Sequence, residues 1–142
     1  AFREGDVLFG KLRPYFHKVV GAPFGGIAST DILVLRAQRP ALTGLVLAAA
    51  CSDAAIASAT ASSEGTRMPR TKWADLASLE VPWPGAQDAE AFSADVLRLA
   101  GWAASTSAES RRLATTRDEL LPLLMSEQVR VKDAEKIVEG VL

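Results

Sequence analysis

The sequence contains few of the residues that form disulfides, metal sites and nucleophilic triads. Its 142 residues include a single cysteine, Cys51, and a single histidine, His17. One cysteine can form neither an intramolecular disulfide nor a multi-cysteine metal site, which fits a reducing cytoplasm. A serine–histidine–aspartate triad would have to use His17. We therefore expect no metal site and no other cofactor.

Long hydrophobic runs are also missing. The sequence has no stretch of 18 or more apolar residues and no basic segment followed by an apolar one at its start. We therefore expect a cytoplasmic protein that is neither membrane-bound nor secreted. The glycines of residues 21–26 are not followed by the Lys-Ser/Thr pair of a phosphate-binding loop. Because the sequence starts at Ala1 without methionine, we interpret it as a piece of a longer chain.

The charge is unevenly distributed along the sequence. Apolar residues make up 49% and charged residues 23%, which favours a folded core, and the net charge is −1. Residues 1–72 carry nine Lys/Arg against five Asp/Glu, a balance of +4, whereas residues 73–142 carry seven against twelve, a balance of −5. This asymmetry suggests that the front half faces an anion and the rear half faces protein.

The first 85 residues predict a small domain of strands and helices. Residues 7–9 and 27–35 are typical of buried strands, and residues 15–20 alternate as a half-buried strand does. The Ala- and Leu-rich residues 41–62 predict one buried helix. Three further segments follow: a polar loop over 63–72, one helical turn over 73–77 and a strand over 79–84.

Residues 88–124 predict one long amphipathic helix, since they contain no proline before Pro122 and no glycine except Gly101. Such a helix would extend roughly 55 Å. We expect part of its apolar stripe to contact another helix, because a domain of about 85 residues cannot cover that length. A short strand over 129–131 and a helix over 133–141 are expected to follow. The partner-facing stripe comprises Phe92, Val96, Leu99, Ala103, Leu113, Leu120 and Leu124.

Four segments, in order along the chain, resemble stretches of one protein family. Residues 5–9 (GDVLF) and 12–18 (LRPYFHK) are similar to its GDILF…RPY..K stretch, and residues 29–35 (STDILVL) to its STD strand. The third segment is GTRMPR at 65–70 followed by LEVPWP at 79–84, and the fourth is the leucine-rich end of a helix, within 113–124. The family is the specificity subunit of Type I restriction–modification systems.

This resemblance implies an α/β (α+β) fold in three parts. Residues 1–85 would form the later part of a mixed-sheet DNA target-recognition domain, residues 86–126 a long coiled-coil-like spacer helix, and residues 127–142 a C-terminal strand and short helix. It also implies sequence-specific binding to double-stranded DNA. Methyltransferase and restriction subunits would dock on the chain and carry out the chemistry, and the long helix would also allow a homodimer.

Two alternatives stay open at this point. The chain could be the C-terminal recognition domain of a fused N6-adenine DNA methyltransferase. The catalytic Asp/Asn-Pro-Pro-Tyr/Phe motif that holds the target amine is not in this sequence. The second alternative is a protein-only assembly module, which the nearly neutral net charge favours.

The first candidate DNA-binding cluster comprises Lys11, Arg13, Tyr15 and Lys18. Lysine and arginine neutralise phosphates, and arginine can pair bidentately with guanine. The alternative interpretation is a solvated strand edge protected by charge. The tyrosine alone is more typical of a core position than of a base contact.

The second candidate cluster lies on the polar loop and comprises Thr66, Arg67, Arg70 and Lys72. Hydroxyl groups and cations are the side chains that bind phosphate oxygens, although a solvated loop would also be polar. Arg67 is the first choice, because it occupies a position matched by the resemblance.

Two other features receive structural interpretations. Ser29, Thr30 and Asp31 look like a nucleophile set, but side-chain hydrogen bonds at a strand start explain them better. Cys51 lies in an Ala-rich segment and is interpreted as a small core residue.

Overall fold

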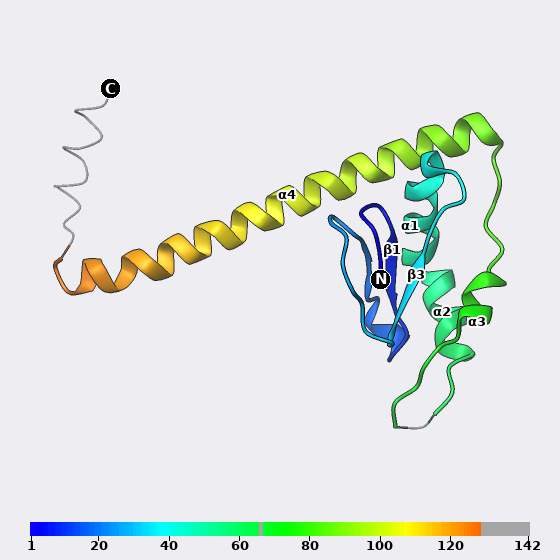
Figure 1. Cartoon of the computed structure of the whole chain (residues 1–142), viewed down its shortest axis with the longest axis horizontal. Coiled ribbons are helices and arrows are strands. Elements are labelled where there is room, and N and C mark those ends of the chain that lie inside the picture. The colour runs from blue at the N-terminus through cyan, green and yellow to red at the C-terminus, as the bar shows by residue number, and fades with distance from the viewer. Residues whose placement is uncertain (66, 129–142) are drawn as a thin grey trace. The chain divides into compact units, whose positions relative to one another are not determined.

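The structure is a computed structural model that describes residues 1–65 and 67–128. It divides into two compact units, Ala1–Ala100 and Gly101–Leu142. The first unit combines a small sheet with helices, which confirms the expected mixture of strands and helices (Figure 1). The strand and helix predicted over 129–131 and 133–141 lie outside the described residues.

The sheet has three strands, β1 (Val7–Gly10), β2 (Val19–Gly21) and β3 (Ile32–Leu35). Their order is β2-β1-β3, and β1 pairs antiparallel with both neighbours. The prediction of a mixed sheet is therefore wrong for the described residues. The physical reason is the connections between strands, which are short loops, whereas parallel neighbours need a long crossover.

Three predicted strands differ from the structure. Residues 14–16 form a short 3-10 helix, η1 (Pro14–Phe16), so the strand predicted over 15–20 is reduced to β2. The strand predicted over 27–35 begins only at Ile32. The strand predicted over 79–84 does not form in the described chain. Two prolines in that last segment cannot donate hydrogen bonds to a sheet.

The helix predicted over 41–62 is interrupted. It consists of a 3-10 turn, η2 (Pro40–Leu42), then α1 (Thr43–Cys51) and α2 (Asp53–Ala61). Ser52 separates the last two with an extended backbone (φ −66°, ψ 148°), and its Oγ accepts a hydrogen bond from the Ala55 N–H at 3.1 Å. This serine is an N-cap, so a new helix starts here.

The other two helices agree with the sequence. The predicted turn is α3 (Trp73–Ala77), and the long helix is α4 (Ala86–Met125).

In the described part of the chain no single helix is both long enough and apolar enough to span a membrane. The bent pair formed by Pro40–Cys51 and Asp53–Ala61 reaches the required length and composition only when its two helices are taken together.

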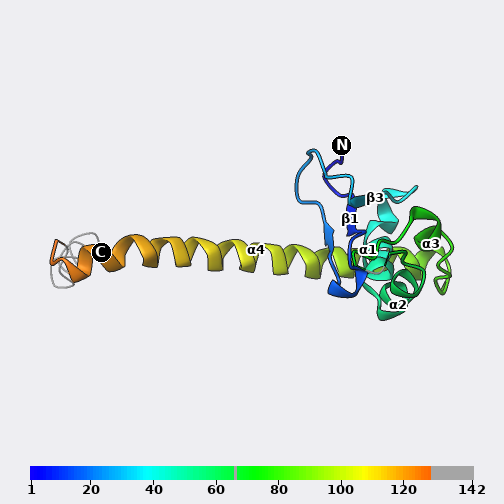
Figure 2. The same ribbon diagram turned by 90° about the horizontal axis from the view of Figure 1, so that it is seen from below.

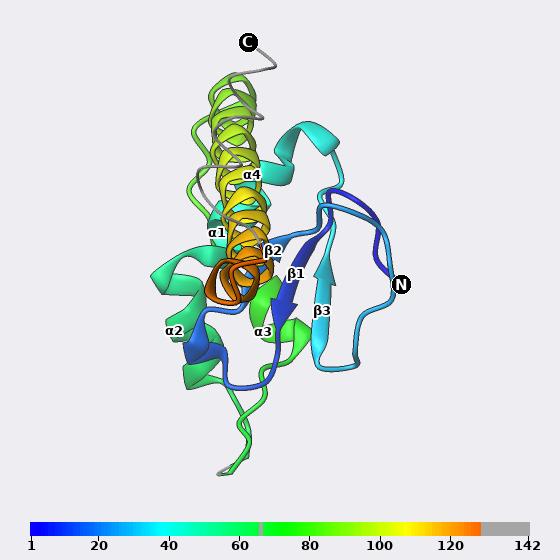
Figure 3. The same cartoon turned by 90° about the vertical axis from the view of Figure 1, so that its left-hand side faces the viewer.

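The core of the first unit lies between the sheet and the helices. Val7 and Phe9 point to the same face of β1 because alternate residues of a strand do so, and both are buried. They cluster with Leu47 of α1 and with Ile56 and Ala59 of α2. Figures 1 and 3 show α1 and α2 on one side of the sheet, and Figure 2 shows α3 beside them.

The beginning of α4 belongs to this packed unit. Ala89 and Ser93 are fully buried, and Val96 and Ala100 pack against the core cluster. The sequence predicts that residues 86–126 form the spacer helix and that Val96 lies on its partner-facing stripe. In the structure Val96 packs against its own domain.

The second unit is helical from Gly101 to the end of α4. Four residues of the predicted stripe lie here, and all are exposed: Ala103, Leu113, Leu120 and Leu124. Trp102 is also 71% exposed. The described residues of this unit therefore carry apolar side chains on a helix surface that no other described residue of the unit covers.

Candidate nucleic-acid interface

The two basic segments, residues 11–18 and 67–72, are joined by backbone hydrogen bonds. The Arg13 N–H donates to the Pro69 carbonyl at 2.8 Å, and the Thr71 N–H donates to the Lys11 carbonyl at 3.2 Å. Leu12 and Arg70 form an antiparallel bridge between these bonds. Two segments about fifty residues apart in the sequence therefore lie side by side, and we call them together the basic surface.

The second basic segment is the end of a closed loop. The backbone groups of Glu64 and Arg70 exchange two hydrogen bonds, at 3.1 and 3.0 Å. Gly65 begins the loop with φ +99°, a conformation that L side chains rarely adopt. Arg67 and Met68 are exposed between these points. The predicted contact residue Thr66 lies outside the described residues.

The first basic segment folds back on itself around η1. Residues on both sides of this turn, Arg13 and His17, have φ of 51°. Pro14 is buried, whereas Tyr15 and Phe16 are 47% and 59% exposed. The interpretation of Tyr15 as a core residue is therefore wrong, because the turn exposes its ring instead of directing it into the sheet.

The turn ends next to β1. The Gly10 N–H donates to the Lys18 carbonyl at 2.8 Å, and a Cβ on Gly10 would lie 2.9 Å from the Lys18 Cβ. Glycine permits this close approach, which brings Lys18 back beside the start of its own segment.

Asp31 lies among the cations and was not predicted as a site residue. Arg70 Nε donates to its Oδ1 at 3.0 Å. This hydrogen bond, with the nearby charges of Arg70, Lys11 and Lys18, lowers the pKa of the Asp31 carboxyl. Its backbone N–H donates to Ser29 Oγ at 3.2 Å, which confirms the predicted hydrogen bond before the strand.

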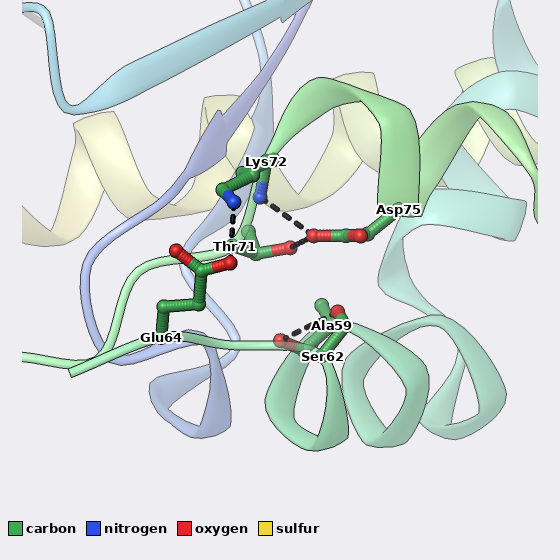
Figure 4. Close-up of polar contacts among 6 residues, drawn as sticks. All are labelled: Ala59, Ser62, Glu64, Thr71, Lys72 and Asp75. Carbon is green, nitrogen blue, oxygen red and sulfur yellow. Dashed lines mark hydrogen bonds and ion pairs between the residues drawn. The ribbon is translucent and has the colours of Figure 1, made fainter. Parts of the chain in front are cut away.

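Lys72 has a carboxylate partner of its own. Figure 4 shows its ammonium paired with Glu64, and this pair raises the pKa of Lys72. Its backbone N–H donates to Asp75 Oδ2 at 2.8 Å, and the Thr71 hydroxyl contacts the same oxygen at 3.3 Å. Asp75 thereby caps the start of α3.

The cations of the basic surface fall into two groups. Arg70 and Lys72 have ion-pair partners, but both pairs are exposed, and such pairs are weak. Within residues 1–65 and 67–128, the other four cations have no ion-pair partner. The basic surface therefore keeps an excess of positive charge from Lys11, Arg13, Lys18 and Arg67.

Cys51 and the possible metal ligands were the remaining candidates for a site, and neither adds to the basic surface. Cys51 is exposed at the end of α1, so its interpretation as a core residue is wrong. The helix break directly after it places it at a helix end rather than within a continuous buried helix. The described chain contains no group of three His, Cys, Asp or Glu side chains placed to hold a metal ion.

The basic surface as a whole can bind an anion, because its cations lie on two segments that backbone hydrogen bonds hold side by side.

Comparisons with known proteins add no family to this description: no protein-family model and no curated protein sequence matches the chain.

Proposed function

We propose that the chain is a sequence-specific DNA recognition module of a Type I restriction–modification system. It is not catalytic itself, and it directs partner methyltransferase and restriction subunits to their target, whether as a separate subunit or fused to the methyltransferase. One observation carries the proposal: backbone hydrogen bonds between Arg13 and Pro69, and between Lys11 and Thr71, join two basic segments into one surface.

The chemistry of this surface fits double-stranded DNA. Lysine and arginine side chains neutralise backbone phosphates, and arginine also pairs with the edge of guanine in the major groove. Arg13 and Arg67 are the side chains that we expect to reach bases, because both are exposed and have no ion-pair partner among the described residues. Lys11 and Lys18 then hold phosphates.

Salt dependence of duplex binding tests this function. Four to six neutralised phosphates should give a plot of log association constant against log salt with a slope of roughly −4 to −5. The affinity should be measured with a pool of random-sequence duplexes and with duplexes selected from that pool. A slope near zero, or equal affinity for both, contradicts a sequence-specific DNA reader.

A matched pair of double variants locates the binding surface. Arg13→Gln with Arg67→Gln removes two positive charges from the basic surface. Arg111→Gln with Arg112→Gln removes two exposed positive charges from α4. The first variant should weaken duplex binding roughly tenfold or more at about 0.1 M salt, and the second should leave it nearly unchanged. Equal losses would mean that only the net charge matters.

A protein assembly module is the second candidate. The exposed apolar residues of the second unit, Trp102, Leu113 and Leu120 among them, favour it. The two functions are compatible in one chain, since a helix can join recognition units while another surface binds DNA. An assembly module alone would self-associate or bind a partner, with no measurable affinity for duplex DNA.

A further inference from the structure

The basic surface carries an exposed aromatic pair. Tyr15 and Phe16 are neighbours in η1, and their ring centroids lie 4.8 Å apart with the ring planes inclined by 52°. Both rings are about half exposed or more. The contact between the two rings therefore leaves apolar ring surface in water, where a ligand can reach it.

The backbone holds this pair in place. Pro14 is buried beneath the turn, and the Phe16 and His17 N–H groups donate to the carbonyls of Arg13 and Pro14 at 3.1 and 2.9 Å. A short hydrogen-bonded turn anchored at a buried proline thereby fixes the backbone from which both side chains project. A ligand can contact the two rings without a rearrangement of this backbone.

Positive charge adjoins the rings. Lys18 Nζ lies over the Phe16 ring at 5.8 Å from its centroid. The same lysine acts electrostatically on Asp31, the partner of Arg70. The aromatic pair therefore lies beside the cations of the basic surface, and a ligand that uses both combines an apolar face with negative charge.

We propose that Tyr15 and Phe16 bind a base that has left the DNA stack, while the adjoining cations hold its phosphates. In an intact duplex the faces of the bases are covered by their neighbours, and only the edges can be reached. An unstacked or single-stranded base offers its face, and aromatic side chains bind such faces with little dependence on sequence. The preferred ligand is therefore DNA that contains an unpaired base. This inference rests on the proposed function.

Binding of bulged DNA tests the proposal. The probes are an intact duplex and the same duplex with one bulged 2-aminopurine, whose fluorescence falls when it stacks on an aromatic ring. The wild-type chain should bind the bulged duplex roughly tenfold more tightly than the intact one. It should also quench the 2-aminopurine emission.

Two leucine variants locate the contact. Phe16→Leu should remove most of the preference for the bulge and most of the quenching. Phe24→Leu is the matched control, since Phe24 is also exposed but contacts Phe2 rather than the basic surface. It should keep both.

The outcomes separate the two proposals. If the wild-type chain binds both duplexes equally, or if Phe16→Leu keeps the preference and the quenching, the base-binding inference is overturned and DNA recognition stands. If the wild-type chain binds neither duplex, the proposed function fails and the inference fails with it. The wild-type comparison is decisive even if a variant does not fold.

Discussion

Gly44 donates its backbone N–H to Ser93 Oγ at 2.8 Å in a buried contact that joins α1 to the beginning of α4. A Cβ at position 44 would lie 2.0 Å from the Ser93 carbonyl oxygen. No side chain fits at this distance, so glycine lets the two helices approach closely. The ion pair between Arg39 and Glu90 lies near the same junction.

Gly44→Ala should therefore destabilise the first unit strongly. The added methyl group meets backbone atoms that cannot move without shifting α4, and overpacking of this kind costs on the order of 3 kcal/mol. Urea denaturation followed by circular dichroism would measure the free energy of unfolding.

Gly101→Ala, in α4, is the matched control. A Cβ at position 101 would meet no atom of the described residues within 4 Å. Alanine should stabilise the helix there by about 0.5–1 kcal/mol, because glycine is a poor helix former. If both substitutions had the same effect, helix propensity rather than steric contact would decide the stability at Gly44.

The ion pair between Asp6 and Arg36 should make stability depend on pH in acid. Asp6 is 2% exposed and accepts two hydrogen bonds from Arg36 and one from the Arg3 N–H. These bonds lower its pKa to about 2 from an ordinary 3.8. A lowered pKa means that the folded state favours the carboxylate, so its contribution is present above pH 4 and disappears as the pH falls towards 2.

Asp6→Asn should cost about 2 kcal/mol at pH 7, the usual contribution of hydrogen bonds to a charged group. The difference from the wild-type chain should shrink when thermal unfolding is measured at successively lower pH between 4 and 2. Glu4→Gln removes a neighbouring exposed carboxylate and should leave the profile unchanged. A difference that stays constant down to pH 2 would mean that Asp6 contributes by packing rather than by charge.

The sequence identified the main elements where one strong local pattern governs the backbone. The apolar residues around Val7 and Phe9 and the long uninterrupted pattern of α4 are examples. Ser52 shows a signal that was present but overlooked, because a serine followed by an aspartate is a common helix start. The aromatic pair was missed because alternation predicted a strand, which would place Tyr15 and Phe16 on opposite faces.

The sequence identifies the residues of the candidate site but does not show that the fold brings its two basic segments together. Both basic segments stand out by composition, yet nothing local shows that Leu12 pairs with Arg70. Nor does any local signal show that Asp31 neutralises part of the cluster, since it lies 39 residues before its partner. Long-range pairing depends on the whole fold, and a sequence pattern reports only on its own segment.

Asp31→Asn should strengthen DNA binding. The carboxylate competes with phosphate for Arg70 and opposes the charges of Lys11 and Lys18. Its removal frees about one additional cation, which should raise the affinity for duplex DNA roughly threefold to tenfold at about 0.1 M salt and steepen the salt slope by about one. Fluorescence anisotropy of a labelled duplex would measure both.

Asp95→Asn is the control for that experiment. Asp95 pairs with Arg98 on the exposed surface of α4, so its removal changes the net charge of the chain by the same amount. It should change the affinity little. A weaker rather than stronger affinity of Asp31→Asn would indicate that the carboxylate positions Arg70 for DNA instead of competing with it.

The exposed residues of the second unit should mediate self-association. At about 100° per residue, Leu113 and Leu120 lie on one face of the helix, and Ala104 and Ala108 lie on the opposite face. Leu113→Glu with Leu120→Glu should convert dimers into monomers in sedimentation equilibrium, because charges within an apolar helix contact lose their hydration. Ala104→Glu with Ala108→Glu adds the same charge and should leave the dimer intact. A wild-type chain that stays monomeric at high concentration would contradict pairing between copies, and the exposed leucines would then be available to a different protein.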